Sequence, residues 1–140
     1  GKTNLGRVNL RLANLQGANL SFADLGGVDL SNADLREASL DNADLSYINL
    51  NRALYTDETT FPADFSPDDL NMIRIGPESN LKGVDLSGTS LKGMDLRGSD
   101  LSGANLRNAN LSGVDLRGAN LSDVDLRGAN LRVAYLRESN

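Results

Sequence analysis

Residues 103–121 read GANLRNANLSGVDLRGANL, and this stretch decides the fold. Leucine occupies every fifth position, a small residue stands two places earlier, as at Ala104, and Asn or Asp directly precedes the leucine, as at Asp115. The pattern contains 22 leucines, at every fifth residue from 5 to 50 and from 81 to 136. A period of five fits neither an α-helical face nor a long strand. It predicts a solenoid, in which each short repeat buries its apolar side by stacking on its neighbours.

One repeat, Val114 to Gly118, shows how five residues can form one side of a coil. Alternate side chains of an extended segment point to opposite faces, so Val114 and Leu116 are expected to face inward and Asp115 and Arg117 outward. Gly118 then lies at a bend, where a type II turn requires a positive φ. Residues 81–138 have mostly Gly, Asn or Asp at this place, whereas the first block has Leu, Phe, Glu and Tyr at several bends. We therefore expect type II turns in the second block and type I-like turns in the first.

The repeats resemble those of the pentapeptide-repeat family, and the resemblance covers residues 3–53 and 79–138. It implies an all-β solenoid, namely a right-handed quadrilateral β-helix with four pentapeptides in each 20-residue coil. The whole chain, 1–140, is then expected to form a single domain. The stretch from Thr60 to Pro77 also looks like a segment found in cyanobacterial members, so the chain resembles a cyanobacterial-type member.

The repeat is interrupted at about 54–78, where the spacing between successive leucines is not a multiple of five. All three prolines lie in this stretch, and proline removes a donor from a backbone ladder. We expect an extruded loop with a short helix at about 67–73, because Ser66 and Pro67 followed by two carboxylates form a helix-start signal. The alternative is a run of degenerate repeats, since Ala63-Asp64-Phe65 keeps the old phase.

The interruption is also the first candidate contact surface, because long loops in compact domains are usually functional or disordered. It combines large apolar side chains, which could hold it against the coil, with six acidic residues. The predicted partner contacts are Phe61, Phe65, Asp68, Asp69 and, in the last repeat, Tyr135. Family members dimerise through their C-terminal ends, so the resemblance also implies a homodimer through the C-terminal coil, where Tyr135 stands in place of Asn or Asp.

The charge distribution bears on a second function. The net charge is −5, and some pentapeptide-repeat proteins inhibit a type II topoisomerase as acidic mimics of DNA. Residues 1–52 carry a net charge of −1, residues 53–80 carry −5, and residues 81–140 carry +1. The repeat blocks are nearly neutral, and a duplex mimic needs a continuous acidic stripe. A topoisomerase-directed DNA mimic is therefore the alternative, and a non-catalytic structural or protein-interaction module of unknown partner is the preferred function.

Composition argues against other classes. The chain has no cysteine and no histidine, so it lacks the usual zinc ligands, thiolate nucleophiles and imidazole bases. We expect no enzyme activity, no metal and no cofactor, because the leucine-filled interior leaves no cavity for a substrate. The sequence contains no basic patch with interleaved aromatic residues, so we expect no direct nucleic-acid binding.

The sequence contains no run of 18 apolar residues and no signal peptide, so we expect no membrane insertion. The compartment stays open: the cytoplasm or, if a leader was removed, the periplasm or a lumen.

Overall fold

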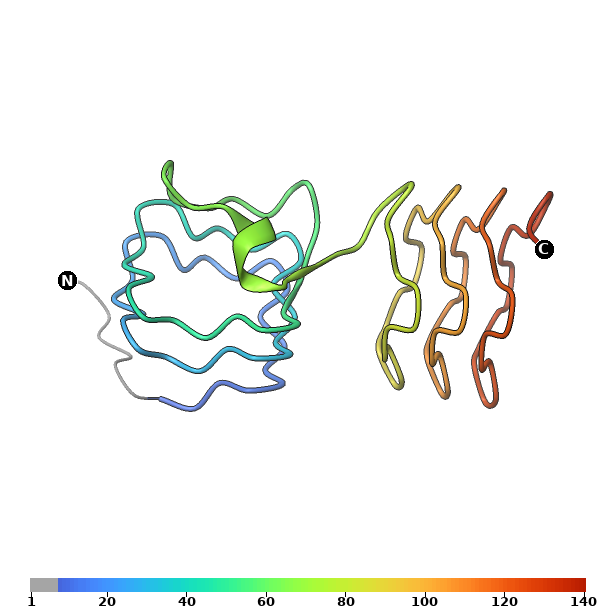
Figure 1. Cartoon of the computed structure of the whole chain (residues 1–140), viewed down its shortest axis with the longest axis horizontal. Coiled ribbons are helices and arrows are strands. Elements are labelled where there is room, and N and C mark those ends of the chain that lie inside the picture. The colour runs from blue at the N-terminus through green and yellow to red at the C-terminus, as the bar shows by residue number, and fades with distance from the viewer. Residues whose placement is uncertain (1–7) are drawn as a thin grey trace. The chain divides into compact units, whose positions relative to one another are not determined.

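The computed structural model describes residues 8–140 as coils of backbone that stack through parallel bridges (Figure 1). The chain divides into two compact units, Gly1–Arg74 and Ile75–Asn140, and each is described here by itself. In both units nearly all the isolated bridges join residues 20 apart, for example Asp24 to Asp44 and Asp95 to Asp115. The coil therefore has the 20-residue period expected of four pentapeptides.

Each side of a coil ends in a hydrogen-bonded turn that begins at the repeat's leucine. Ala119 N–H donates to the Leu116 carbonyl at 3.0 Å, and Gly118, the third residue of that turn, has φ of 70°. Four such turns lie in one coil, for example those that begin at residues 25, 30, 35 and 40. Only one residue separates successive turns, as Asn120 does between the turns that begin at Leu116 and Leu121, which is why most of the pairing consists of isolated bridges rather than strands.

The predicted type I-like turns of the first block are wrong. Leu12, Phe22, Glu37 and Tyr47 all have positive φ, between 56° and 61°, as the glycines of the second block do. A positive φ at the third residue of a turn is the mark of type II, whereas type I has a negative φ there. The stacking of each corner on the next imposes the turn type, even on residues for which this conformation is unfavourable.

The interior follows the predicted alternation. Unit 1 has a buried core of leucines, alanines and one valine, built around Leu25, Leu30, Leu35 and Leu40. In unit 2 the same layers are formed by Leu101, Leu106, Leu111 and Leu116 with their small companions, all essentially inaccessible. Polar residues that flank each leucine cover the outside.

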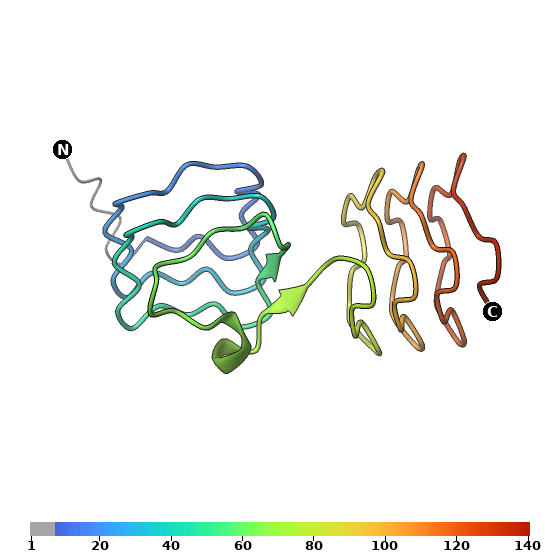
Figure 2. The same ribbon diagram turned by 90° about the horizontal axis from the view of Figure 1, so that it is seen from above.

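The interruption is partly wall and partly loop, so the predicted loop at 54–78 is too wide. Residues 54–60 continue the coil, because Leu54 bridges to Asp34 and Thr60 bridges to Ser39 with one extra residue in the register. The two short strands β1 (Leu54–Tyr55) and β2 (Ile73–Arg74) then pair in parallel (Figure 2). Between these two strands, residues 61–70 leave the ladder. The structure of this stretch therefore combines the two predicted alternatives, an extruded loop and degenerate repeats.

The helix in this stretch is shorter than the predicted 67–73. It is a single 3₁₀ turn, η1 (Pro67–Leu70), with Ser66 before it and Asn71 after it in the left-handed conformation. Ser66 stands at the N-cap position but its side chain makes no capping hydrogen bond. Ile73, three residues after the helix ends, belongs to β2, because its N–H donates to the Ala53 carbonyl and returns the chain to the ladder.

Candidate interaction surfaces

The outward Asn and Asp side chains of the walls accept hydrogen bonds from the backbone. In nearly every described repeat, the Oδ1 atom of this residue accepts a hydrogen bond from the backbone N–H two places later, as Asn105 does from Arg107 at 3.1 Å. Asn side chains also donate to the residue one coil away, as Asn120 does to Asp100 at 3.1 Å. These bonds explain why the position before each leucine is Asn or Asp, a reason that sequence reasoning missed although the pattern was visible.

Where arginine stands two places after aspartate, its guanidinium donates two hydrogen bonds to that carboxylate, an arrangement that we call a fork. In unit 2, Arg117 binds Asp115 through both carboxylate oxygens, at 2.9 and 2.6 Å, and Arg127 binds Asp125 in the same way. The hydrogen bonds from these arginines lower the pKa of Asp115 and of Asp125 to about 2. Arg97 adds a contact of 3.8 Å to Asp115 on the next coil. The walls with these pairs are mosaics of both charges, as the charge count predicted.

The predicted contacts Phe61 and Phe65 are anchors of the interruption. Tyr55 and Phe61 meet edge to face at 5.9 Å between ring centroids, and Phe61 stacks on Phe65 at 4.8 Å. Both phenylalanines are half-buried, and with Leu70 and Met72 they pack against the core of unit 1. The segment that leaves the ladder is therefore held on the coil by its apolar side.

The acidic side of this segment is exposed. Asp68 and Asp69 lie on η1 with their side chains in solvent, and Asp57, Glu58 and Asp64 are exposed nearby in the sequence. We call residues 57–69 the acidic segment. Arg74 of β2 binds Asp57 at 2.7 Å, and this hydrogen bond lowers the pKa of Asp57. Burial, followed by the negative charge of Asp68, raises the pKa of Tyr55.

Tyr55 was missed as a member of this group. It stands where the five-residue phase places the leucine after Leu50, so the substitution of an aromatic residue for leucine was a readable signal. The structure brings Phe61, Phe65, Asp68 and Asp69 together in unit 1. Tyr135 lies in the last coil of unit 2, where it bridges to Asp115 and its side chain is 61% exposed.

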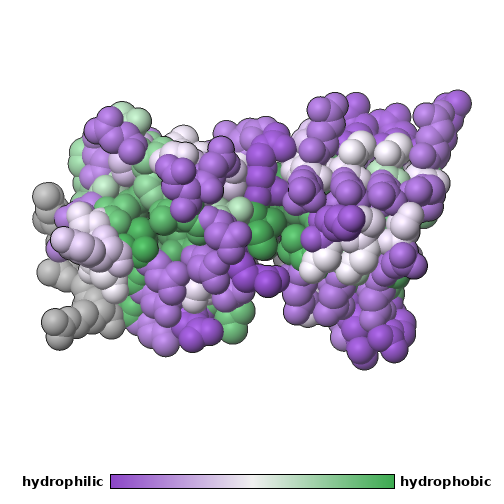
Figure 3. Space-filling model, viewed as in Figure 1, coloured by the Kyte–Doolittle hydropathy of each residue, from purple (hydrophilic) through white to green (hydrophobic). Residues whose placement is uncertain are grey.

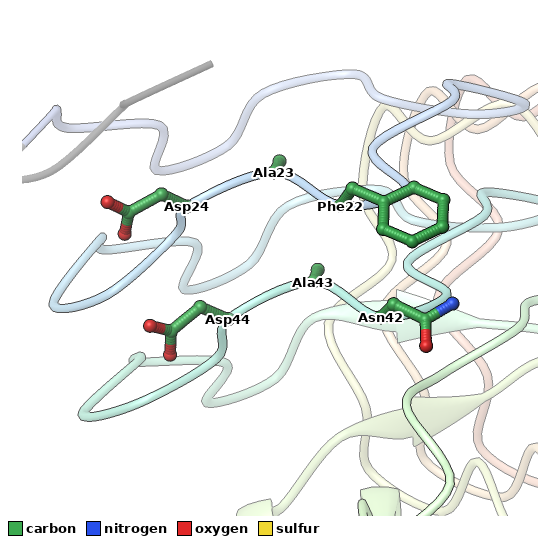
Figure 4. Close-up of a pocket in the computed structure, with 6 residues that line it drawn as sticks. All are labelled: Phe22, Ala23, Asp24, Asn42, Ala43 and Asp44. Carbon is green, nitrogen blue, oxygen red and sulfur yellow. The ribbon is translucent and has the colours of Figure 1, made fainter. Parts of the chain in front are cut away.

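A shallow hollow of about 300 Å³ lies on a wall of unit 1, and sequence reasoning did not single it out (Figure 4). Its lining comes from two successive coils: Phe22, Ala23 and Asp24 from one, and Asn42, Ala43 and Asp44 from the next. More broadly, Figure 3 shows apolar side chains on the viewed face of unit 1, whereas the viewed face of unit 2 is largely hydrophilic.

Two negative findings concern residues 8–140. No group of three or more His, Cys, Asp or Glu side chains could hold a metal ion there. No helix in that range has the length and apolar character needed to cross a bilayer.

A family model for pentapeptide repeats matches the chain in eight copies, over residues 1–32, 18–54, 79–118 and 115–140. The chain belongs to the pentapeptide-repeat family. No curated protein matches it.

Solved structures similar to this pentapeptide-repeat chain include cyanobacterial proteins of the same family. Rfr23 from Cyanothece 51142 is 27% identical, with 99% of this chain and 82% of that one covered and a TM-score of 0.35. HetL from Nostoc sp. strain PCC 7120, a protein involved in regulation of heterocyst differentiation, is 29% identical, with 100% and 77% covered and a TM-score of 0.28.

A third similar structure is trypsin-treated QnrB1, a plasmid-mediated fluoroquinolone resistance protein. It is 18% identical, with 99% of this chain and 82% of that one covered and a TM-score of 0.47. All three TM-scores are below 0.5, and the family membership follows from the repeat matches.

Proposed function

We propose that this pentapeptide-repeat chain is a non-catalytic scaffold that binds a partner protein through the acidic segment. The observation that carries the proposal is the pairing of an apolar anchor with an exposed acidic side in one segment. The stacked Phe61 and Phe65 hold residues 61–70 on the coil, while Asp68 and Asp69 stay in solvent. A surface that is ordered before binding loses less conformational entropy when a partner docks.

Charge supports a basic partner surface. Residues 53–80 contain six acidic residues and one basic residue, Arg74, which binds Asp57. Complementary potentials mainly raise the association rate and the specificity of a complex. In this proposal Asp68 and Asp69 are direct contacts, whereas Phe61 and Phe65 position the segment.

Quantitative affinity capture from the native host tests this proposal. The bait carrying Asp68→Asn and Asp69→Asn is compared with the unchanged chain and with a charge-matched control in unit 2, Asp100→Asn on a wall and Asp123→Asn at a corner. We expect the partner to be lost only from the Asp68 and Asp69 variant. Capture of the same proteins by all three baits would refute the acidic segment as the contact surface.

The remaining features of the fold are part of the same proposal. We infer that the coils wind as a right-handed quadrilateral β-helix and that residues 1–140 form one domain. Support for four sides comes from the 20-residue bridge spacing and the four turns in each coil. Handedness is carried over from the family.

The topoisomerase-directed DNA mimic remains the second proposal. The forks of unit 2 argue against it, because Arg97, Arg117 and Arg127 interrupt any acidic stripe along those walls. An assay of supercoiling by a type II topoisomerase with the purified chain is expected to show no inhibition.

A homodimer through the C-terminal coil is a further proposal of the same kind. Val133, Tyr135 and Leu136 are exposed there, at 81%, 61% and 44%. Exposed apolar groups of this density favour contact with another surface.

A further inference from the structure

The sulfur atoms of this chain belong to two methionines with different surroundings. The sequence has Met72, Met94 and no cysteine, so its sulfur chemistry is that of the thioether. Met72 stands between η1 and β2 and packs, half-buried, against the core of unit 1. Met94 is half-buried in unit 2, where it takes the small inward place two residues before the buried Leu96.

The backbone fixes the position of Met72. Arg52 N–H donates to the Asn71 carbonyl, and Ile73 N–H donates to the Ala53 carbonyl, both at 2.9 Å. The residues on both sides of Met72 are thus bonded to the preceding coil, and its side chain packs against the core. Met72 therefore combines contact with the core and partial exposure to solvent.

Met72 is the member of the anchor whose polarity can be changed by chemistry. The other members that pack against the same core are Phe61, Phe65 and Leu70, whose side chains contain only carbon and hydrogen. Oxidation converts the flexible, apolar thioether into a polar sulfoxide. A polar group in an apolar cluster, without a hydrogen-bond partner, destabilises the packed state. One added oxygen atom at Met72 therefore opposes the packing of the anchor.

Loss of this packing would be a local event. Before the segment Thr60 bridges to Ser39, and after it Ile73 pairs with Leu54 of β1. Both ends of residues 61–70 thus stay in the ladder when the segment itself loosens. Segments with few buried contacts of this kind can open without unfolding of the rest of a domain.

We propose that Met72 is a peroxide-sensitive anchor, whose oxidation loosens residues 61–70 from the core of unit 1. The Met72 sulfur attacks one oxygen of hydrogen peroxide with a lone pair, so that an S–O bond forms as the O–O bond breaks. The proton of the transferred oxygen passes to the leaving hydroxide, which departs as water. The sulfur is oxidised by two electrons and the peroxide is reduced. The loosening itself is independent of the proposed function, and its effect on partner binding rests on that function.

Hydrogen exchange followed by mass spectrometry tests this proposal. The purified chain is treated with hydrogen peroxide until Met72 is converted, and peptide mapping locates the added oxygen. We expect the amides of residues 61–70, such as Phe65 N–H, which donates to the Pro62 carbonyl at 2.9 Å, to exchange about tenfold faster after oxidation. The amides of the unit 2 core, such as Leu106 N–H, should be unchanged. Reduction of the sulfoxide by a methionine sulfoxide reductase should restore the original rates.

Three variants separate Met72 from general oxidative damage. Met72→Leu keeps an apolar side chain of similar volume without sulfur, so the exchange of residues 61–70 should no longer respond to peroxide. Met94→Leu is the matched control, because it removes the other half-buried thioether and should leave the response intact. Met72→Gln places a polar side chain at the anchor and should raise the exchange of residues 61–70 without any oxidant.

An equal response of the Met72→Leu variant and of the unchanged chain would overturn the inference. Unchanged exchange after full conversion of Met72, slow exchange in the Met72→Gln variant, or resistance of Met72 under conditions that convert Met94 would do so as well. The capture experiment is independent of these results. Faster exchange after oxidation, together with unchanged capture by the Asp68 and Asp69 variant, refutes only the proposed contact surface. Loss of capture by that variant, with exchange that does not respond to oxidation, refutes only the anchor.

Discussion

At the scale of the residue, the corner positions show how strongly the stack controls local conformation. Leu12 is 77% exposed and has φ of 59°, although leucine is poorly suited to positive φ. Its backbone is fixed by hydrogen bonds in its own turn and to the next coil, where Leu12 N–H donates to Ser31 at 3.2 Å. The corner therefore stores strain that the rest of the coil offsets.

Relief of this strain gives the first prediction. Leu12→Asn should stabilise the chain by about 0.5–1 kcal/mol, because Asn tolerates positive φ and no buried contact is lost. The midpoint of thermal unfolding, followed by circular dichroism, should rise. Ser87→Asn is the control, since Ser87 is also exposed at a turn and lacks a positive φ. A lower midpoint for Leu12→Asn would contradict strain at this corner.

The aspartate–arginine forks give a prediction about acid. The pKa of Asp115 and that of Asp125 are about 2 in the folded chain, below the ordinary 3.8, so these carboxylates stabilise the fold while they are ionised. That stability is fully present above about pH 4 and is lost as the pH falls from 4 towards 2. Asp115→Asn with Asp125→Asn should flatten the dependence of the unfolding midpoint on pH in this window.

The control for the acid experiment is Asp123→Asn. Asp123 is an exposed corner carboxylate that makes no ion pair in the described part of the chain, so its variant should keep the slope of the unchanged protein. Parallel curves for all three proteins between pH 4 and 2 would show that the forks contribute nothing to acid stability.

Much of the residue-scale structure was predictable, and the exceptions have physical reasons. The burial of Leu106 and Ala104 and the exposure of Arg107 follow from alternation within one short extended segment. The turn type at Phe22 was predicted wrongly from the poor fit of phenylalanine to positive φ. Hydrogen bonds between the stacked coils impose that φ on the residue. The two-residue spacing of Arg117 and Asp115 indicates that they are close, but it does not give the geometry of their two hydrogen bonds.

At the scale of the element, the interruption supplies side chains that cover part of the core of unit 1. β1 and β2 continue the wall, and the segment between them brings Phe61, Phe65, Leu70 and Met72 onto the core. The sequence located this stretch correctly through its prolines and its broken phase. It could not define the loop bounds, because Thr60 and Ile73 rejoin the ladder at spacings of 21 and 19 residues, which a search for a fixed period does not detect.

The anchoring role of the phenylalanines is open to a direct test. Phe65→Ala should destabilise the chain by about 2 kcal/mol, because it removes a half-buried ring that stacks on Phe61. Asp69→Ala, four residues later and exposed on η1, should stay within about 0.5 kcal/mol of the unchanged chain. Chemical denaturation gives both values. Equal effects would mean that residues 61–70 are not packed on unit 1.

At the scale of the whole molecule, the single-domain proposal makes a thermodynamic prediction. The chain divides into two compact units, and one domain requires that they unfold together. Scanning calorimetry should give one transition with equal calorimetric and van't Hoff enthalpies. Leu30→Ala in unit 1 and Leu106→Ala in unit 2 should lower the same midpoint, since both remove buried side chains. Two transitions, each sensitive to only one of these variants, would establish two domains.

The C-terminal coil gives the last prediction, which concerns the number of chains in the particle. Leu121, Leu126 and Leu131 are only half-buried, in contrast to Leu106 and Leu111 one coil earlier. Together with Tyr135 and Leu136 they present apolar area that a symmetric contact with a second copy would bury, at a gain of roughly 25 cal/mol for each Å². Sedimentation velocity at micromolar concentration should therefore give a particle of twice the monomer mass.

The charge variant Tyr135→Lys with Leu136→Lys should convert this particle to monomers, because it places cations in the contact. Leu12→Lys with Tyr47→Lys is the matched control, since these residues are also exposed and apolar but lie on the corners of unit 1. The control should sediment as a dimer. A monomeric unchanged chain, or a dimer that both variants dissociate equally, would remove the C-terminal coil as the contact.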